Sequence, residues 1–194
     1  AALSFQMQKK DNIVLCFFGD GAVNEGSFHE ALNLASLWDL PVLFLCENNQ
    51  YGMSMASDKA VAGESIASRG NSYGIESIQI DGNDVESVFE SVTNFKNEIL
   101  ASNRPKFIEA VTYRYRGHSK SDRNLYRTGD EIEYWKKEKD PIKRYIGKLI
   151  ESGVTEAKLK EIDEGVKELI RDSVKKALDS PMSPVTNLEE DSYA

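Results

Sequence analysis

Continuous apolar runs alternate with helical periodicity along the first part of the chain. The runs occupy residues 13–18, 42–46 and 105–112, and Ile78 and Ile80 mark a shorter one. Runs of this kind, bounded by polar or turn residues, are typical of strands buried in a parallel sheet. Between them, residues 22–37 and a segment from a cap at Asn83 or Asp84 to Leu100 have helical spacing. This β-α-β-α order predicts an α/β fold, a parallel sheet with helices on both faces.

Further helices are predicted at both ends of the chain. Residues 1–9 are typical of the end of a helix, and residues 66–73 of a short helix that stops at Gly74. A helix should begin at Asp140-Pro141, and an amphipathic helix should cover residues 155–178. Its apolar positions are Leu159, Ile162, Val166, Leu169, Ile170, Val174 and Ala177. We therefore expect three parts: an α/β domain at 1–138, helices at 139–180 that pack on it or on a partner, and a flexible acidic tail at 181–194.

Composition excludes several classes of protein. The chain has 194 residues, 40% of them hydrophobic and 29% charged, as expected of a globular domain. Its formal net charge of −8 argues against a nucleic-acid-binding protein. No apolar stretch approaches the roughly 20 residues that span a membrane, and no signal-peptide pattern is visible. Cys16 and Cys46 lie within apolar runs, so we expect buried, reduced thiols and a cytoplasmic location.

Two polar motifs follow the first two predicted strands. Gly19-Asp20-Gly21 comes directly after one apolar run, and Asn48-Asn49 after the next. Ligands of parallel sheets gather at the carboxyl ends of the strands. Carboxylate and amide oxygens suit Mg²⁺, which often takes phosphate oxygens as further ligands. Because the glycines let the backbone approach a ligand, and a helix predicted from Ala22 would present N–H groups, we expect a joint metal and diphosphate site.

The spacing of these motifs resembles a known fingerprint. Thiamine-diphosphate enzymes carry Gly-Asp-Gly and, further along the chain, Asn-Asn at a similar spacing. Here Asp20 and Asn49 are 29 positions apart. The longer stretches GDGAVNEGSFHEALNLA and ENNQYG resemble the alpha subunit of the decarboxylating component of 2-oxo acid and acetoin dehydrogenase complexes. In that family the helix matching residues 1–9 lies well inside the subunit. The resemblance therefore implies that residues 1–138 are a thiamine-diphosphate-binding domain whose N-terminal part is missing.

A basic loop after the strand at 105–112 supports the resemblance. Residues 113–122 read YRYRGHSKSD, and YRT follows at 126–128. Clustered cations suit an anionic ligand. The Arg-Gly-His-Ser segment resembles the family's active-site loop, which implies that Arg114 and His118 reach the diphosphate and that His118 is catalytic. Ser119 matches a serine that kinases phosphorylate in mitochondrial relatives, but the stretch at 122–126 is one residue shorter and lacks the second regulatory serine.

The resemblance implies a role for each remaining motif residue. Asp20 and Asn49 would bind Mg²⁺ through side-chain oxygens, and Tyr51 through its backbone carbonyl. Gly19, Gly21 and Ala22 would contact the cofactor, the last two through backbone N–H groups. The activating glutamate comes from the beta subunit, so we expect this chain to be inactive alone. The expected enzyme is an alpha2-beta2 assembly that passes an acyl unit to lipoyl groups of an acyltransferase component.

Several alternatives stay open. The loop at 116–128 resembles acetoin-type subunits more than pyruvate-type ones, and branched-chain oxo acids are a third option. A dinucleotide-binding reductase fits the strand–helix setting but not Asn24 or Asn48-Asn49. A truncated chain could also be a noncatalytic interaction fragment. Taken singly, Asn48-Asn49 could be a turn, Asn24 and Glu25 could stabilise a first helical turn, and His29 is best explained as structural.

Overall fold

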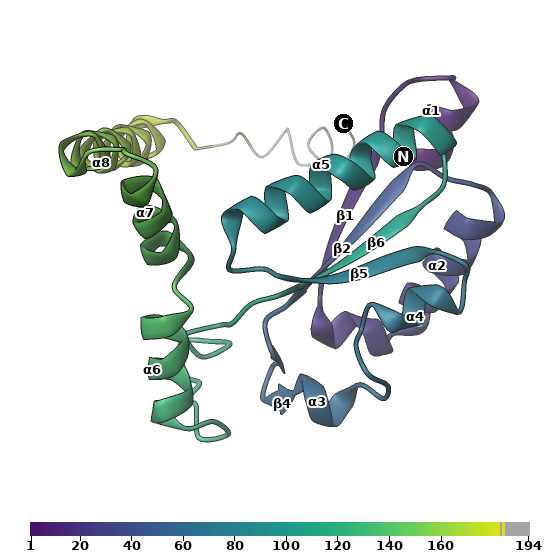
Figure 1. The fold of residues 1–194 in the computed structure, drawn as a ribbon, viewed down its shortest axis with the longest axis horizontal. Helices are drawn as coiled ribbons and strands as arrows, with labels where there is room; N and C mark the ends of the chain where they lie inside the picture. Colours follow the sequence, from purple (N-terminus) through teal and green to yellow (C-terminus); the bar gives the residue numbers. More distant parts are fainter. Residues whose placement is uncertain (183, 185–194) are drawn as a thin grey trace. The chain divides into compact units, whose positions relative to one another are not determined.

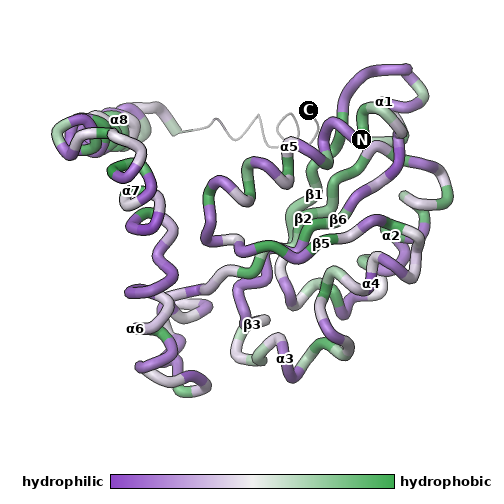
Figure 2. Tube along the Cα trace, viewed as in Figure 1, coloured by the Kyte–Doolittle hydropathy of each residue, from purple (hydrophilic) through white to green (hydrophobic). Residues whose placement is uncertain are grey.

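Four parallel strands form the centre of the fold in the computed structural model, which describes residues 1–182 and 184 (Figure 1). The sheet order is β1 (Val14–Gly19), β2 (Val42–Asn48), β6 (Lys106–Val111) and β5 (Glu76–Asp81). Each neighbouring pair is parallel. Together with the helices between the strands, this confirms the predicted α/β fold. In Figure 2 much of β1, β2 and β6 is coloured as hydrophobic.

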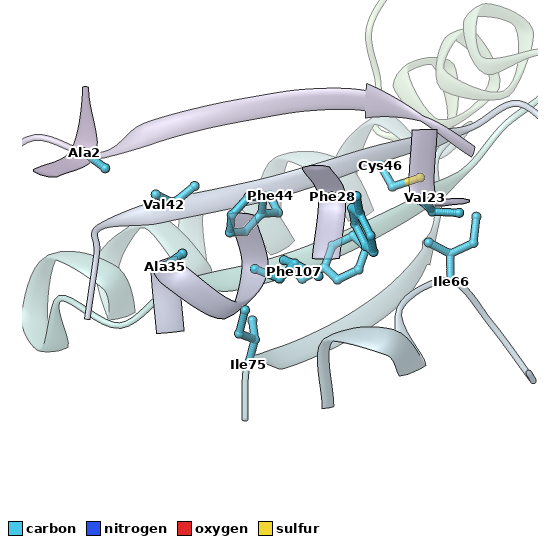
Figure 3. Packing of buried hydrophobic residues seen from close by; sticks show 11 residues of the cluster. Ala2, Val23, Phe28, Ala35, Val42, Phe44, Cys46, Ile66, Ile75 and Phe107 are labelled. Atoms are coloured by element: carbon cyan, nitrogen blue, oxygen red, sulfur yellow. The ribbon is translucent and has the colours of Figure 1, made fainter. Parts of the chain in front are cut away.

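One face of the sheet packs against α1 (Ala2–Met7), α2 (Gly26–Leu37) and the segment around α4 (Ser68–Asn71). Phe44 and Phe107 from the sheet meet Phe28 from α2 in a buried cluster (Figure 3). The ring centroids of Phe28 and Phe107 lie 6.1 Å apart at a steep interplanar angle, a favourable arrangement for aromatic pairs. This cluster holds α2 against the sheet, and it thereby fixes the point at which the segment between β1 and α2 ends.

The opposite face packs against α5 (Val85–Ser102). Phe95 and Ile99 of this helix lie on Leu43, Leu45, Ile108 and Ala110 of the two central strands. The side chain of Asp84 accepts hydrogen bonds from the backbone N–H groups of Glu86 and Ser87. Asp84 is therefore the N-cap, as one of the two predicted alternatives had it.

Strand β1 forms an edge of the sheet, and part of one face is uncovered. Leu15 pairs in register with Leu43, and Phe17 with Leu45, so both point to the face that α5 covers. Helix α5 lies over the other strands, and Leu15 and Phe17 are 39% and 58% exposed. The edge strand therefore presents apolar side chains beside a free row of backbone groups.

The prediction of a helix from Ala22 was wrong at its start. Residues Asp20–Asn24 form a 3₁₀ turn, η1, and α2 begins only at Gly26 because Glu25 has an extended backbone. Neither Asn24 nor Glu25 stabilises the first turn of α2 with its side chain. Asn24 instead donates to the carbonyl of Ala60 at 3.2 Å and accepts from Arg69. The segment thus links β1 to the loop around α3 (Ser57–Ala60).

Three helices follow β6. Helix α6 (Gly129–Glu138), capped by Thr128, was not predicted, whereas α7 (Pro141–Glu151) and α8 (Glu156–Asp179) were. The chain divides into two units, Ala1–Tyr145 and Ile146–Ala194, so the division falls within α7. Most of the apolar positions of α8 are exposed in the second unit, and Leu159 is partly buried. Most of the predicted tail at 181–194 lies outside the described residues.

Two smaller expectations concern His29 and membrane segments. His29 Nδ1 lies 2.8 Å from the hydroxyl of Tyr73, and its ring meets Phe28 edge-on, which supports the structural role predicted for it. Within residues 1–182 and 184, no helix has the length and apolar character required to cross a membrane. Cys16 and Cys46 are free thiols, partly and fully buried respectively.

Candidate functional site

A cavity of about 510 Å³ opens where β1 and β2 end. It is bounded by η1, by the hairpin of β3 (Tyr51–Gly52) and β4 (Met55–Ala56), and by the loop after β6. Every residue that the sequence analysis assigned to the site lines this one cavity: Gly19, Asp20, Gly21, Ala22, Asn49, Tyr51, Arg114 and His118. Segments up to 99 positions apart in the sequence therefore converge on one cavity.

Asp20 supplies a buried carboxylate to the cavity wall. The residue is 3% exposed, and no ion pair with it occurs among the residues that the structure describes. Burial raises the pKa of this carboxyl above its ordinary value, while hydrogen bonds from the backbone of Asp20 and Asn49, and the charge of Arg114, offset part of the rise. A cation bound beside Asp20 would complete the compensation of its charge.

The two asparagines after β2 have different surroundings. Asn48 Nδ2 donates to Glu109 at 2.7 Å, and its Oδ1 accepts from the backbone N–H of Gln50 at 3.1 Å. Asn49 lines the cavity, and its Oδ1 accepts from the N–H of Tyr51 at 3.3 Å. Both side chains thus shape the turn, as the simpler interpretation had it. Of the two, only Asn49 also reaches the cavity.

Two glycines let the β3 hairpin approach η1 closely. A Cβ atom on Gly52 would lie 3.2 Å from Gly21 Cα and 4.0 Å from Asp20 Oδ2. A Cβ atom on Gly21 would lie 3.5 Å from Gly52 Cα. Both glycines line the cavity, and neither carries a side chain that would stand between its backbone and a ligand there.

Replacing Gly52 with alanine should push the hairpin away from Gly21, because the new methyl group meets backbone rather than a movable side chain. We expect a loss of about 1 kcal/mol in the free energy of unfolding, and about tenfold weaker binding of a ligand held between the two loops. Thermal denaturation and titration calorimetry measure the two effects. Gly129→Ala is the control, because nothing lies within 4 Å of a Cβ there; equal effects in both variants would contradict the argument.

Arg114 contacts the β3 hairpin rather than open solvent. Its Nη1 donates to the carbonyl oxygen of Tyr51 at 3.1 Å, and its Nη2 to the carbonyl of Met53 and the hydroxyl of Tyr126. The carbonyl that the resemblance assigns to a metal therefore faces a guanidinium in this structure. A metal ion could use that carbonyl only through its second lone pair or after Arg114 moves away.

The loop that carries His118 is organised by Asp122. The Asp122 carboxylate accepts from the backbone N–H groups of His118 and Asn124, both at 2.8 Å, and from the hydroxyl of Tyr126 at 2.7 Å. These hydrogen bonds lower the pKa of Asp122 to about 2. Ser119 lies beyond the cavity, in a neighbouring recess of about 400 Å³ that also includes His118.

Sequence reasoning missed two acids near the cavity, and it included Arg127 in the basic motif without giving it a role of its own. Glu109, in β6, is 1% exposed and accepts from Asn48 and from the backbone N–H of Ala67 at 2.9 Å. Arg127 is buried behind Arg114, and Glu131 accepts from the hydroxyls of Tyr51 and Tyr113. A carboxylate within an apolar strand was the available signal for Glu109. No periodic pattern marks Arg127 or Glu131.

Metal-ligating side chains are sparse. Across the described part of the chain, no cluster of three or more His, Cys, Asp or Glu residues could hold a metal ion. A cation at Asp20 would therefore depend on the amide of Asn49, on backbone carbonyls and on oxygens of a bound ligand. Mg²⁺ is the metal that binds in this way, through one or two carboxylates plus substrate phosphates.

Comparisons with known proteins agree over almost the whole chain. A family model described as "Dehydrogenase E1 component" matches residues 1–186. The pyruvate dehydrogenase E1 component subunit alpha of Rhizobium meliloti (strain 1021) is 38% identical over 191 residues, covering 98% of this chain and 55% of that protein. The mitochondrial type I subunit alpha of Ascaris suum is 41% identical over 194 residues, covering 99% and 48%.

A relative with a different name also matches. The mitochondrial 2-oxoisovalerate dehydrogenase subunit alpha of Mus musculus is 40% identical over 154 residues, covering 79% of this chain and 35% of that protein. The chain spans about half the length of the Rhizobium and Ascaris relatives.

Proposed function

Because the chain belongs to the dehydrogenase E1 component family, we propose that it carries the cofactor-anchoring half of an alpha subunit. In this proposal the cavity at the ends of β1 and β2 binds thiamine diphosphate together with Mg²⁺. The observation that carries it is the carboxylate of Asp20, buried in the cavity wall with no ion-pair partner in the described residues. A divalent cation there would offset the cost of burying this charge.

Each cavity residue takes a role that suits its chemistry. The side chains of Asp20 and Asn49 and the carbonyl of Tyr51 offer oxygen ligands to Mg²⁺. The close contact between Gly21 and Gly52 leaves room for phosphate oxygens beside the backbone. The remaining cofactor contacts fall to Gly19, Ala22, Arg114 and His118, all of which line the same cavity.

Thiamine diphosphate, when bound, supplies the electron sink needed to break the carbon–carbon bond of a 2-oxo acid or acetoin. This chain's residues anchor and orient that group. Arg114 offers a planar, permanently charged donor to the diphosphate. His118 offers an imidazole, a side chain suited to moving protons near neutral pH, and is the proposed catalytic residue.

The substrate and partners follow from the family. We propose a 2-oxo acid substrate, with pyruvate favoured by the names of the Rhizobium and Ascaris relatives; acetoin, favoured by the loop at 116–128, is the alternative. The proposed partners are a beta subunit, in an alpha2-beta2 assembly, and a lipoyl-bearing acyltransferase, in the cytoplasm. Residues 139–180 are proposed to pack on the α/β domain or on a partner. Since the activating glutamate is expected to come from the beta subunit, we expect this chain to be inactive alone.

Titration calorimetry with thiamine diphosphate tests the anchoring role. In the presence of Mg²⁺ the chain should bind the cofactor, and removing the metal with a chelator should weaken binding at least about tenfold, or 1.4 kcal/mol. Thiamine, which lacks the diphosphate, should bind no better with Mg²⁺ than without it. If a chain shown to be folded binds thiamine and thiamine diphosphate equally, or not at all, the alternative of a noncatalytic interaction fragment is the better one.

A further inference from the structure

One buried arginine behind the cavity wall contacts both loops that carry site residues. Arg127 is 8% exposed and lies just before α6. Its Nη1 donates to the carbonyl of Arg114, and its Nη2 to the carbonyl of Tyr115 at 3.2 Å and to Asn124 Oδ1 at 2.9 Å. These hydrogen bonds fix the backbone from which the Arg114 side chain extends toward the cavity.

The same guanidinium lies among three tyrosine rings. Its central carbon is 5.3 Å from the ring centroid of Tyr113, 5.6 Å from that of Tyr51 and 5.7 Å from that of Tyr126. Each distance is within the range of a cation–π attraction. Tyr51 belongs to the β3 hairpin, whereas Tyr113 and Tyr126 belong to the loop after β6. The charge of Arg127 therefore attracts tyrosine rings from both loops that border the cavity.

Glu131 completes the connection from α6. Its Oε1 accepts from the hydroxyls of Tyr51 and Tyr113, both at 2.9 Å. Burial and the neighbouring Glu131 raise the pKa of each phenol to about 12, so both stay neutral hydrogen-bond donors at physiological pH. The carboxylate of Glu131 thus joins the β3 hairpin to the segment that follows β6.

We propose that Arg127 and Glu131 are positioning residues that fix Arg114 and the carbonyl of Tyr51 relative to each other. Neither residue lines the cavity, so each acts through a residue that does. Arg114 Nη1 already reaches the carbonyl of Tyr51 at 3.1 Å. We call Arg127 and Glu131 together the brace, because they hold the two loops that make this contact. The consequence for cofactor affinity rests on the proposed function; the mechanical role does not.

Stability alone explains Arg127 poorly. Its Nε is buried without a hydrogen-bond partner, and no carboxylate in the described residues forms an ion pair with it. Incompletely satisfied buried charges are costly, and apolar replacements are often neutral or stabilising. A planar donor with two main-chain acceptors is instead suited to fixing geometry.

Hydrogen exchange tests the mechanical role without any ligand. In Arg127→Met, amides in residues 50–53 and 112–118 should exchange about tenfold faster, because local opening of both loops becomes easier. Arg127→Lys should behave like Arg127→Met, since a lysine keeps the charge but loses the planar fork. Amides of β2 and β6 report on global unfolding and should not change. Arg123→Met, an exposed arginine in the same loop, is the matched control.

Glu131→Gln provides a second variant if Arg127→Met does not fold. Its amide oxygen can accept from both phenols but lacks the charge that strengthens these hydrogen bonds, so exchange in both loops should speed to a smaller extent. Unchanged exchange in the two loops of both folded variants would overturn the brace. Faster exchange in only one loop would overturn its proposed coupling of the two sides.

Titration of the same variants with thiamine diphosphate and Mg²⁺ tests the consequence. Arg127→Met should raise the Kd about tenfold in the wild-type background and less than about twofold in an Arg114→Met background, because residues that act through one another are not additive. Fully additive losses would show that Arg127 does not act through Arg114. If the wild-type chain binds no cofactor while the exchange result holds, the proposed function fails and the brace stands.

Discussion

Replacing Asp20 with asparagine should weaken Mg²⁺-dependent binding of thiamine diphosphate at least about 100-fold, or 2.7 kcal/mol. The substitution keeps the size of the side chain and one oxygen but removes the negative charge that faces the metal. Mg²⁺ is a hard cation that relies on carboxylate ligands. Among the carboxylates that line the cavity, Asp20 is the least exposed, at 3%. Another acid of the cavity wall would have to move to take its place as the metal ligand.

The same substitution should have the opposite effect on the stability of the ligand-free chain. The pKa of Asp20 is raised in the folded state, so ionising this group costs stability. That cost begins as the pH rises through the ordinary range of an aspartate and is complete above the raised pKa. Asp20→Asn should therefore match the wild type in acid and be more stable than it near neutral pH. A mutation that merely damaged the fold would lower stability at every pH.

Titration calorimetry and thermal denaturation from pH 3 to 7, from about one unit below to about three units above the ordinary aspartate pKa, measure the two effects. Asp11→Asn, an exposed aspartate before β1, is the control and should change neither. Metal-dependent binding of undiminished affinity in Asp20→Asn would remove Asp20 from the site. Lower stability of Asp20→Asn than of the wild type at neutral pH would contradict the argument that burying the ionised Asp20 costs stability.

Replacing Glu109 with leucine should destabilise the folded chain by about 3 kcal/mol, because it leaves two buried donors unpaired. Those donors are Asn48 Nδ2 and the backbone N–H of Ala67, which now lie 2.7 and 2.9 Å from the Glu109 carboxylate. For a chain of this size the loss corresponds to a fall in Tm of about 6–12 °C. Because Asn48 also shapes the turn before Asn49, the affinity for the cofactor should fall as well.

Glu47→Leu is the matched control for this prediction. Glu47 belongs to the neighbouring strand β2 and pairs in register with Ala110, but it is exposed. Differential scanning calorimetry of the two variants should separate them clearly. A Tm for Glu109→Leu within about 2 °C of the wild type, less than 1 kcal/mol, would show that the two donors find other partners.

The strands could be predicted because mostly apolar segments bounded by polar or turn residues mark them. Residues 13–18, 42–46 and 105–112 each overlap a strand of the sheet, with ends shifted by at most two residues. The start of α2 could not, because η1 and the extended Glu25 depend on contacts with the β3 hairpin. Helix α6 escaped prediction because its ten residues include only three apolar side chains, Ile132, Tyr134 and Trp135, too few for a clear periodic pattern.

The cavity residues were predicted by motif and resemblance, and the residues behind them were not. Asp20 and Asn49 follow strands directly, so parallel topology alone brings them to one edge of the sheet. The contact between Tyr51 and Glu131 joins residues 80 positions apart. Such a pair leaves no local signature, because each residue alone is compatible with an exposed surface.

The position of β1 at the margin of the sheet has a consequence for assembly. Asp20 follows β1 directly, and among the residues that the structure describes no strand pairs with the outer edge of β1, where Leu15 and Phe17 are exposed. Any strand that pairs in parallel with β1 would end next to Asp20 and add to the cavity wall. Occupancy of the edge and occupancy of the cavity would then be thermodynamically linked. Each would strengthen the other by the same factor, so quaternary structure and cofactor saturation could not be titrated independently.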